Sequence, residues 1–161
     1  MFSKIISLAA IIFVYGATVV HAESHTVKFV NRCGYGTPTL SQNFNTLSTG
    51  GDYTANGPFE AAVAWLNTGS CGFQGTGCTL VELTLKNPPS PGAGSSADIS
   101  LIPPHTFNVA ASFSYFNGCD GQGKTCSNAN CPNTDAFHVT TDYGAQVQCE
   151  ANNVGLTITF C

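Results

Sequence analysis

The chain has 161 residues, of which 9% are charged, and its formal net charge at pH 7 is −4. This balance disfavours nucleic acid as a partner, because binding to phosphates needs clustered cations. The polar surface must come mainly from Asn, Thr, Ser and Gly, which suits sugar binding but also suits any soluble secreted domain.

The first residues have the pattern of a secretory signal peptide. Lys4 precedes an apolar stretch over residues 5–20, and Val20-His21-Ala22 provides the small-residue ending that suits signal peptidase. A membrane anchor is the alternative, but the strongly apolar part is short for a bilayer span. We therefore expect residues 1–22 to be removed, residues 23–161 to form a single domain, and the protein to be extracellular without a membrane span.

Apolar and polar residues alternate along much of the remaining chain, which is typical of half-buried β-strands. In chain order, the alternation predicts strands over residues 25–30, 61–65, 81–85, 107–115 and 156–160. In the second run Ala61, Val63 and Trp65 share a face, so core packing is the expected role of Trp65.

Turn-forming residues separate these runs at positions 48–52, 56–58, 87–92 and 117–118. Beyond the signal peptide no helical period is sustained. The sequence therefore predicts an all-β sandwich, with the Pro/Gly/Ser stretch at 87–96 as a long surface connection.

All eight cysteines follow residue 22, as expected in an oxidising compartment. Eight cysteines allow 105 pairings, so spacing alone does not choose among them. Short separations favour two local bonds, Cys161 at the chain end is expected to pair with Cys33, the first cysteine of the mature chain, and Cys119 is then left for Cys149. The predicted bonds are Cys71–Cys78, Cys126–Cys131, Cys119–Cys149 and Cys33–Cys161.

A zinc site is the alternative use of Cys126 and Cys131, with His138 as a further ligand. The chain has no Cys-x-x-Cys pair, and thiols are oxidised outside the cell. We expect neither a metal nor another cofactor.

Short motifs along the whole mature chain resemble those of thaumatin-like proteins, in family order. The resemblance links residues 27–35 (VKFVNRCGY) to V/I-x-N-x-C-x-Y, 64–71 (AWLNTGSC) to W-x-R-T-x-C, 80–85 (LVELTL) to L-A-E-F-x-L, 97–100 (ADIS) to D-I-S, 105–109 (HTFNV) to G-F-N-V, 118–119 (GC) to G-C, and 157–161 (TITFC) to V-T-F-C. Each motif alone is weak, whereas the ordered set is fairly specific.

Typical members carry a disulfide-rich second domain, which is shortened here to a segment holding Cys126, Cys131 and Cys149. The chain thus resembles the small secreted thaumatin-like proteins and so-called glycopeptides of mushrooms. The resemblance implies a disulfide-stapled antiparallel β-sandwich, Cys33–Cys161 closure, and short loops in place of the second domain. It also implies a role in host defence, through β-glucan binding, weak glucanase activity or inhibition of hydrolases.

Larger relatives have an acidic cleft lined by an arginine, a glutamate and several aspartates. Glu82 matches the glutamate and Asp98 the aspartate of D-I-S, whereas Asn67 stands at the arginine position. Because Glu82 alternates with Val81 and Leu83, it should lie on the face opposite the core. Two carboxylates on adjacent strands could serve as acid and base in glycoside hydrolysis, or could simply be solvated strand residues.

Tyr115 and Asn117 lie at the end of the longest predicted strand, where a binding loop would be built. We predict a lectin-like, non-catalytic protein that binds cell-wall β-glucan or another glycan in defence. The predicted ligand-binding residues are Glu82, Asp98, Asn67, Tyr115 and Asn117. One alternative is a weak endo-β-1,3-glucanase using Glu82 and Asp98, and another is a hydrolase inhibitor or secreted protein-binding effector.

Overall fold

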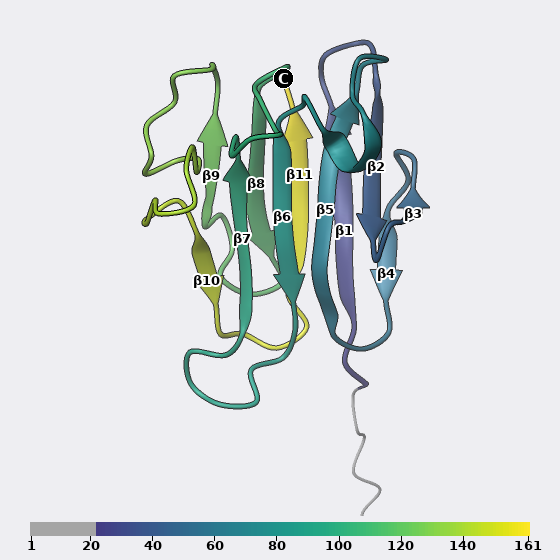
Figure 1. The fold of residues 1–161 in the computed structure, drawn as a ribbon. Coiled ribbons are helices and arrows are strands. Elements are labelled where there is room, and N and C mark those ends of the chain that lie inside the picture. The colour runs from purple at the N-terminus through teal and green to yellow at the C-terminus, as the bar shows by residue number, and fades with distance from the viewer. Residues whose placement is uncertain (1–21) are drawn as a thin grey trace, which may run out of the picture.

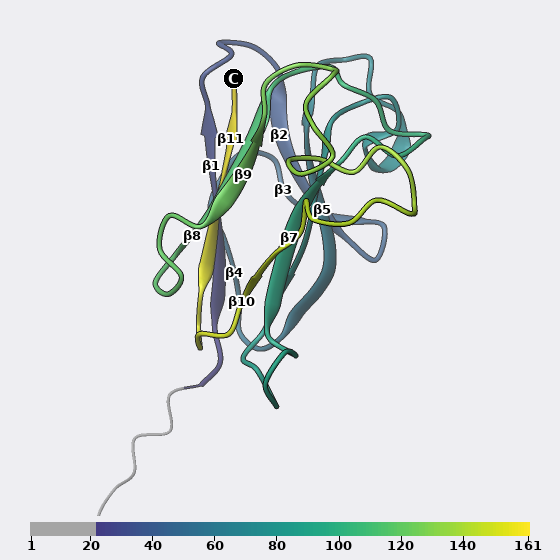
Figure 2. The same ribbon diagram turned by 90° about the vertical axis from the view of Figure 1, so that its left-hand side faces the viewer.

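The computed structural model describes residues 22–161, so the predicted signal peptide, apart from Ala22, lies outside the described residues. Two β-sheets pack face to face in this part of the chain (Figure 1), and the second view shows the two layers from the side (Figure 2). The one helical element among residues 22–161 is a short 3₁₀ turn, η1 (Phe73–Gly75). The predicted all-β, disulfide-stapled sandwich is confirmed.

The five-stranded sheet brings the first and last strands together. Its strand order is β4 (Tyr53–Ala55), β1 (His25–Asn31), β11 (Gly155–Phe160), β8 (Ala111–Phe116) and β9 (Gly123–Cys126). β1 and β11 run parallel, with Phe29 opposite Ile158, whereas the other pairs in this sheet are antiparallel. The predicted antiparallel pattern therefore has one exception, at the pair that joins the two chain ends.

The six-stranded sheet is antiparallel and forms the other layer. Its order is β10 (Val147–Cys149), β7 (Ser95–Ser100), β6 (Leu80–Leu85), β5 (Phe59–Asn67), β2 (Thr37–Gln42) and β3 (Asn45–Ser48). Residues 127–146, η1 and the β2–β3 hairpin project from the outer side of this sheet (Figure 2).

The core lies between the sheets and follows the predicted alternation in most strands. β6 contributes Val81, Leu83 and Leu85, and β11 contributes Leu156, Ile158 and Phe160, all of them buried. Between them, Glu82 and Thr84 of β6 and Thr157 and Thr159 of β11 are only partly buried. Removing these apolar side chains from water supplies the main driving force for folding.

β5 departs from the predicted alternation. The main core receives Ala62, Ala64 and Leu66, whereas Trp65 lies on the opposite face in a second cluster with Cys78 and Leu80. Trp65 is buried and shares a face with Val63 as predicted, but this face is the outer one and not the core between the two sheets. The cause is that η1 covers the outer face of this strand.

The predicted strand over residues 107–115 begins only at Ala111. Before it, the Asn108 side chain accepts a hydrogen bond from the Thr79 backbone N–H (2.9 Å), and the Thr79 hydroxyl donates to the Val109 carbonyl (2.9 Å). These side-chain bonds replace a strand ladder, which is why alternating residues here do not form β-structure.

The four disulfides are the predicted pairs: Cys33–Cys161, Cys71–Cys78, Cys119–Cys149 and Cys126–Cys131. The zinc alternative is wrong, because both Cys126 and Cys131 are in a disulfide, and His138 Nε2 is hydrogen-bonded to the Cys131 carbonyl (2.7 Å). No helix within residues 22–161 has the length and apolar character needed to cross a bilayer.

Candidate functional site: a groove on the six-stranded sheet

Two adjoining cavities, each of about 270 Å³, lie on the outer face of the six-stranded sheet. They share Ala61, Val63 and Glu82, so together they form one groove. At one end the groove is lined by Asp98 and Gln146, and at the other by Phe44 and His105. Both predicted carboxylates, Glu82 and Asp98, lie in it.

A β-bulge in β5 shapes the floor of the groove. Phe59 opposes Leu85 and Ala62 opposes Leu83, so Glu60 and Ala61 together face one residue of β6, Thr84. Ala61 has a φ of 53°, in the left-handed region, and its N–H donates to the Thr84 hydroxyl (3.0 Å). Bulges of this kind re-aim side chains and are frequent beside functional sites. Here the bulge leaves the small side chain of Ala61 where a larger residue would fill the groove.

Glu82 and Asp98 form an acid pair across β6 and β7. They are directly opposite in the register, as predicted for carboxylates on neighbouring strands. Asp98 is 7% exposed. Burial, the charge of Glu82 and a hydrogen bond with the Glu82 side chain raise the pKa of Asp98 to about 8. At neutral pH the pair therefore holds one proton between its two carboxyl groups.

One oxygen of the acid pair has unsatisfied hydrogen-bonding capacity. Asp98 Oδ1 is buried and receives no N–H or hydroxyl hydrogen bond from residues 22–161. Gln146, from the segment that leads into β10, forms the wall beside it and favours ionisation of Asp98 through a hydrogen bond. A buried acceptor without a donor is costly, so either the shared proton or a ligand must satisfy Oδ1.

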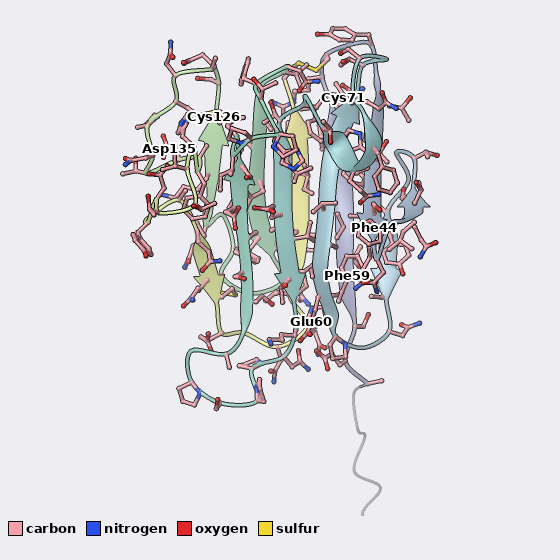
Figure 3. The ribbon with its side chains drawn as sticks, viewed as in Figure 1. Phe44, Phe59, Glu60, Cys71, Cys126 and Asp135 are labelled. Atoms are coloured by element: carbon pink, nitrogen blue, oxygen red, sulfur yellow. A yellow bond between two sulfur atoms is a disulfide. The ribbon has the colours of Figure 1, made fainter. Side chains whose placement is uncertain are left out.

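Two exposed phenylalanines stand at the other end of the groove. Phe44 is 75% exposed and Phe73 is 71% exposed, and their rings stack with centroids 5.8 Å apart. Figure 3 shows Phe44 at the β2–β3 hairpin. We call Phe44 and Phe73 the aromatic pair.

Phe44 occupies an unfavourable position for its residue type. It and Asn43 form the two-residue turn between β2 and β3, with φ of 65° and 49°. Such hairpin turns favour glycine at the second position, because a side chain there is strained. Neither turn chemistry nor core packing explains a phenylalanine here, so a function on the surface is the better explanation.

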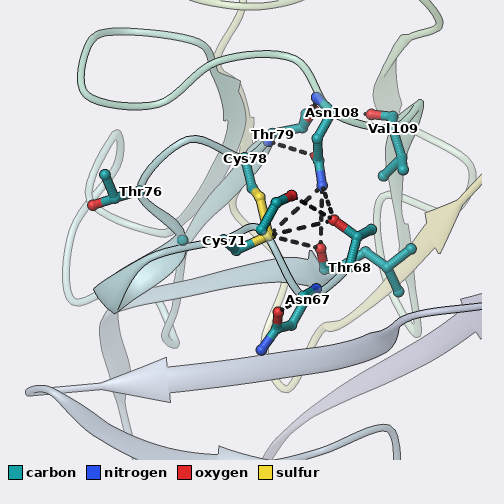
Figure 4. Close-up of a disulfide and its surroundings, with 12 residues drawn as sticks. Asn67, Thr68, Cys71, Thr76, Cys78, Thr79, Asn108 and Val109 are labelled. Carbon is teal, nitrogen blue, oxygen red and sulfur yellow. Dashed lines mark hydrogen bonds between the residues drawn. A yellow bond between two sulfur atoms is a disulfide. The ribbon is translucent and has the colours of Figure 1, made fainter.

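Phe73 is positioned by the loop that the Cys71–Cys78 disulfide closes (Figure 4). Gly75, with φ of 75°, lies directly over Trp65 and Leu80, where an added Cβ would clash with the Leu80 side chain. The Asn108 amide donates to the Leu66 carbonyl (3.3 Å) and lies beside the Cys71 sulfur. The loop is thus held against β5 and β6.

The other predicted ligand-binding residues lie away from the groove. Tyr115 is in the core at 2% exposure, and its hydroxyl donates to the Val147 carbonyl (3.0 Å), so its prediction as a ligand-binding residue is wrong. Burial and the charge of Asp98 raise the pKa of Tyr115 above its ordinary value. Asn67, at the end of β5, accepts from the Gly69 N–H, and Asn117 donates to the Asn153 carbonyl. Neither lines the groove, and their predicted roles have no support from it.

The aromatic pair and the groove amides of Gln42, Gln74 and Gln146 were not predicted from the sequence. A signal for the aromatic pair was present. Phe44 lies in the polar run Gln42–Asn45, and Phe73 lies in a Gly-rich loop between two cysteines. Large apolar residues in such turns have no strand to bury them, which marks them as candidates for binding.

Comparison with known proteins gives little guidance. No family model matches the chain, and no curated protein matches it. The resemblance to thaumatin-like proteins therefore stays a prediction. The crystal structure of the protein elicitor MoHrip2 from Magnaporthe oryzae is similar, at 14% sequence identity and a TM-score of 0.46, over 84% of this chain and 98% of its own.

Proposed function

We propose that the protein is a secreted, non-catalytic lectin whose glycan ligand lies in the groove of the six-stranded sheet. The observation that carries this proposal is the continuity of the groove from the acid pair to the aromatic pair. A defensive role and a cell-wall β-glucan ligand are what the resemblance to thaumatin-like proteins implies.

The groove lining has the two kinds of groups that sugar recognition needs. The apolar face of a pyranose packs on an aromatic ring, and Phe44 offers such a ring where the groove is open. Sugar hydroxyls need donors and acceptors, which Gln42, Gln74, Gln146 and the acid pair supply. This combination supports a glycan better than a wholly apolar ligand.

Secretion is supported by the cysteines. All eight are in disulfides, and no free cysteine is found within residues 22–161. Such bonds persist in oxidising compartments and are rare in the cytosol.

Hydrolysis by the acid pair is less well supported than binding. Glycosidases hold their two carboxyl groups about 5 Å apart when they retain configuration, and about 6.5–9.5 Å apart when they invert it. Glu82 and Asp98 are in hydrogen-bonding contact, which leaves no room for a glycosidic bond or a water molecule between them. We expect the wild-type protein to release no reducing sugar from β-1,3-glucan. Release that Glu82→Gln abolishes would support the glucanase alternative instead.

A glycan array combined with pull-down on insoluble β-glucan tests the proposal. The sharpest variant is Phe44→Gly, because glycine is the favoured residue at that turn position. We expect this variant to fold at least as stably as the wild type, and to bind glycan about tenfold more weakly because the stacking surface is lost. Thermal unfolding and the pull-down measure the two effects.

Tyr35→Ala is the matched control, since Tyr35 is an exposed aromatic residue (58%) that does not line the groove. It should bind like the wild type. Unchanged binding by Phe44→Gly would place the ligand elsewhere. If no glycan bound and the protein instead captured a secreted hydrolase, with weaker capture by Phe44→Gly, the inhibitor or effector alternative would be favoured.

A further inference from the structure

The acidic end of the groove has no cation of its own. The four Lys and Arg residues among residues 22–161 are placed elsewhere. Lys86 pairs with Glu60 (3.1 Å), Lys124 lies near Asp135 (3.9 Å), Lys28 lies over the Phe116 ring, and Arg32 lines a different cavity. His105 lies at the opposite end of the groove, where its Nδ1 is hydrogen-bonded to the Gly75 carbonyl (3.0 Å). The acid pair is therefore not neutralised within the described residues.

The buried Asp98 oxygen indicates what kind of group is missing. Asp98 Oδ1 lies in a side chain that lines the groove and is 93% buried, yet no N–H or hydroxyl of residues 22–161 donates to it. Glu82, directly opposite, is also an acceptor when ionised. Two facing acceptors with one proton between them form a site for a group that brings several donors.

An ammonium group fits this site better than a hydroxyl does. It carries three N–H donors and a positive charge, so it can donate to both carboxyl groups at once and offset the one negative charge of the pair. The proton held between the carboxyls stays in place. A hydroxyl donates one hydrogen bond and leaves the negative charge of the pair in place. The net charge of −4 adds a general attraction for cations.

We infer that the groove selects an oligosaccharide with free amino groups, such as a glucosamine oligomer, with one ammonium donating to Glu82 and Asp98 from the groove side and a neighbouring sugar ring toward Phe44. This inference rests on the proposed function and narrows it to a class of glycan. The N-acetylated form of the same oligomer has the same rings and linkages without the charge, so the two forms make a matched pair of ligands.

Calorimetric titration of the full mature protein with a glucosamine oligomer, and with the N-acetylglucosamine oligomer of equal length, tests the inference. At pH 6 and low salt we expect the amino form to bind at least about tenfold more tightly, because a hydrogen bond to a charged group is worth more than a neutral one. Added salt should weaken the amino form and leave the acetylated form nearly unchanged.

Variants locate the effect at the acid pair. Glu82→Gln should reduce the affinity for the amino form to that for the acetylated form, with binding of the acetylated form kept. Asp98→Asn should act in the same way. If this variant does not fold because Asp98 is buried, Glu82→Gln alone tests the inference. Glu60→Gln is the matched control, because Glu60 is an exposed carboxylate on β5 outside the groove and removes the same charge.

The outcomes separate the inference from the proposed function. Equal binding of both oligomers, or tighter binding of a neutral β-glucan, with Phe44→Gly still weakening it, would overturn the amino-sugar inference and leave the glycan-binding groove intact. An equal loss of affinity in Glu60→Gln and Glu82→Gln would show that net charge alone attracts the ligand, which also overturns the inference. If no glycan of any class binds, both the inference and the proposed function fail.

Discussion

A single buried carboxyl should set part of the pH dependence of stability. The pKa of Asp98 in the folded protein is about 8, because it is buried and faces Glu82, whereas an aspartate in an unfolded chain has a pKa of about 3.9. Between these values the folded state binds one more proton than the unfolded state. The stabilising contribution of Asp98 is therefore complete below about pH 4 and is lost as the pH rises to about 8, at up to about 1.4 kcal/mol per pH unit.

Asp98→Asn tests this dependence at the residue scale. Asparagine has the shape of the protonated acid and cannot ionise, so the variant should be more stable than the wild type at pH 9, with the difference shrinking toward pH 5. Urea unfolding at pH 5, 7 and 9 with the disulfides intact measures it. Asp52→Asn, at an exposed turn residue, should follow the wild type at each pH. Parallel pH curves for Asp98→Asn and the wild type would contradict the raised pKa.

At the scale of elements, Asn108 ties the loop of η1 to two neighbouring segments. Its side chain accepts from the buried Thr79 N–H and donates to the Leu66 carbonyl at the end of β5 (Figure 4). Phe73 lies on the same disulfide-closed loop, so the anchoring of this loop also determines where one ring of the aromatic pair lies.

Asn108→Ala should lower the free energy of unfolding by about 1–3 kcal/mol, because the Thr79 N–H is left buried without an acceptor. It should also weaken glycan binding through the loosened loop. Urea unfolding and amide hydrogen exchange at Thr79 measure the two steps. Asn117→Ala serves for comparison, since the exposed Asn117 makes its hydrogen bond at the edge of the other sheet and should cost less. Unchanged exchange at Thr79 would show that Asn108 is not the anchor.

The elements that the sequence predicted well are those in which one face alone is buried. β1 and β11 follow the alternation, because the core takes every second residue, and β6 follows it from Val81 onward. Prediction failed in β5, where the bulge shifts the pattern and η1 buries Trp65 on the outer face. It also missed β2, β3 and β4, strands rich in polar residues, of which β2 pairs with β5 and β4 with β1.

The same distinction holds for the groove. Glu82 and Asp98 could be predicted as neighbours on adjacent strands. Alternation places Glu82 on the face opposite the core, and the family motifs match both residues to carboxylates of one cleft. The aromatic pair joins a hairpin turn to a disulfide loop, which no local pattern connects. Tyr115 was misplaced because its closeness to a turn made it resemble a loop residue. Alternation alone identifies it as inward-facing.

At the scale of the whole molecule, the parallel pairing of β1 and β11 determines how the chain closes. Both strands finish at the same end of the sheet, with Asn31 opposite Phe160 and the Arg32 N–H donating to the Phe160 carbonyl (2.9 Å). Cys33 and Cys161 lie just beyond these ends and join segments 128 residues apart. The groove lies on the other sheet, so closure of the chain and binding of a ligand use separate surfaces.

Removing the Cys33–Cys161 bond should therefore lower stability more than it lowers binding. In the chain-entropy model a loop of this length contributes about 5 kcal/mol, whereas the short loop closed by Cys126–Cys131 contributes about 2 kcal/mol. Replacing each pair by two alanines and measuring urea unfolding compares the two bonds. The terminal variant should lose more stability and, where it is still folded, bind glycan as the wild type does, because its sheet makes no part of the groove. If it lost no more stability than the Cys126/Cys131 variant, the parallel pairing of β1 and β11 would hold the ends together without the covalent bond.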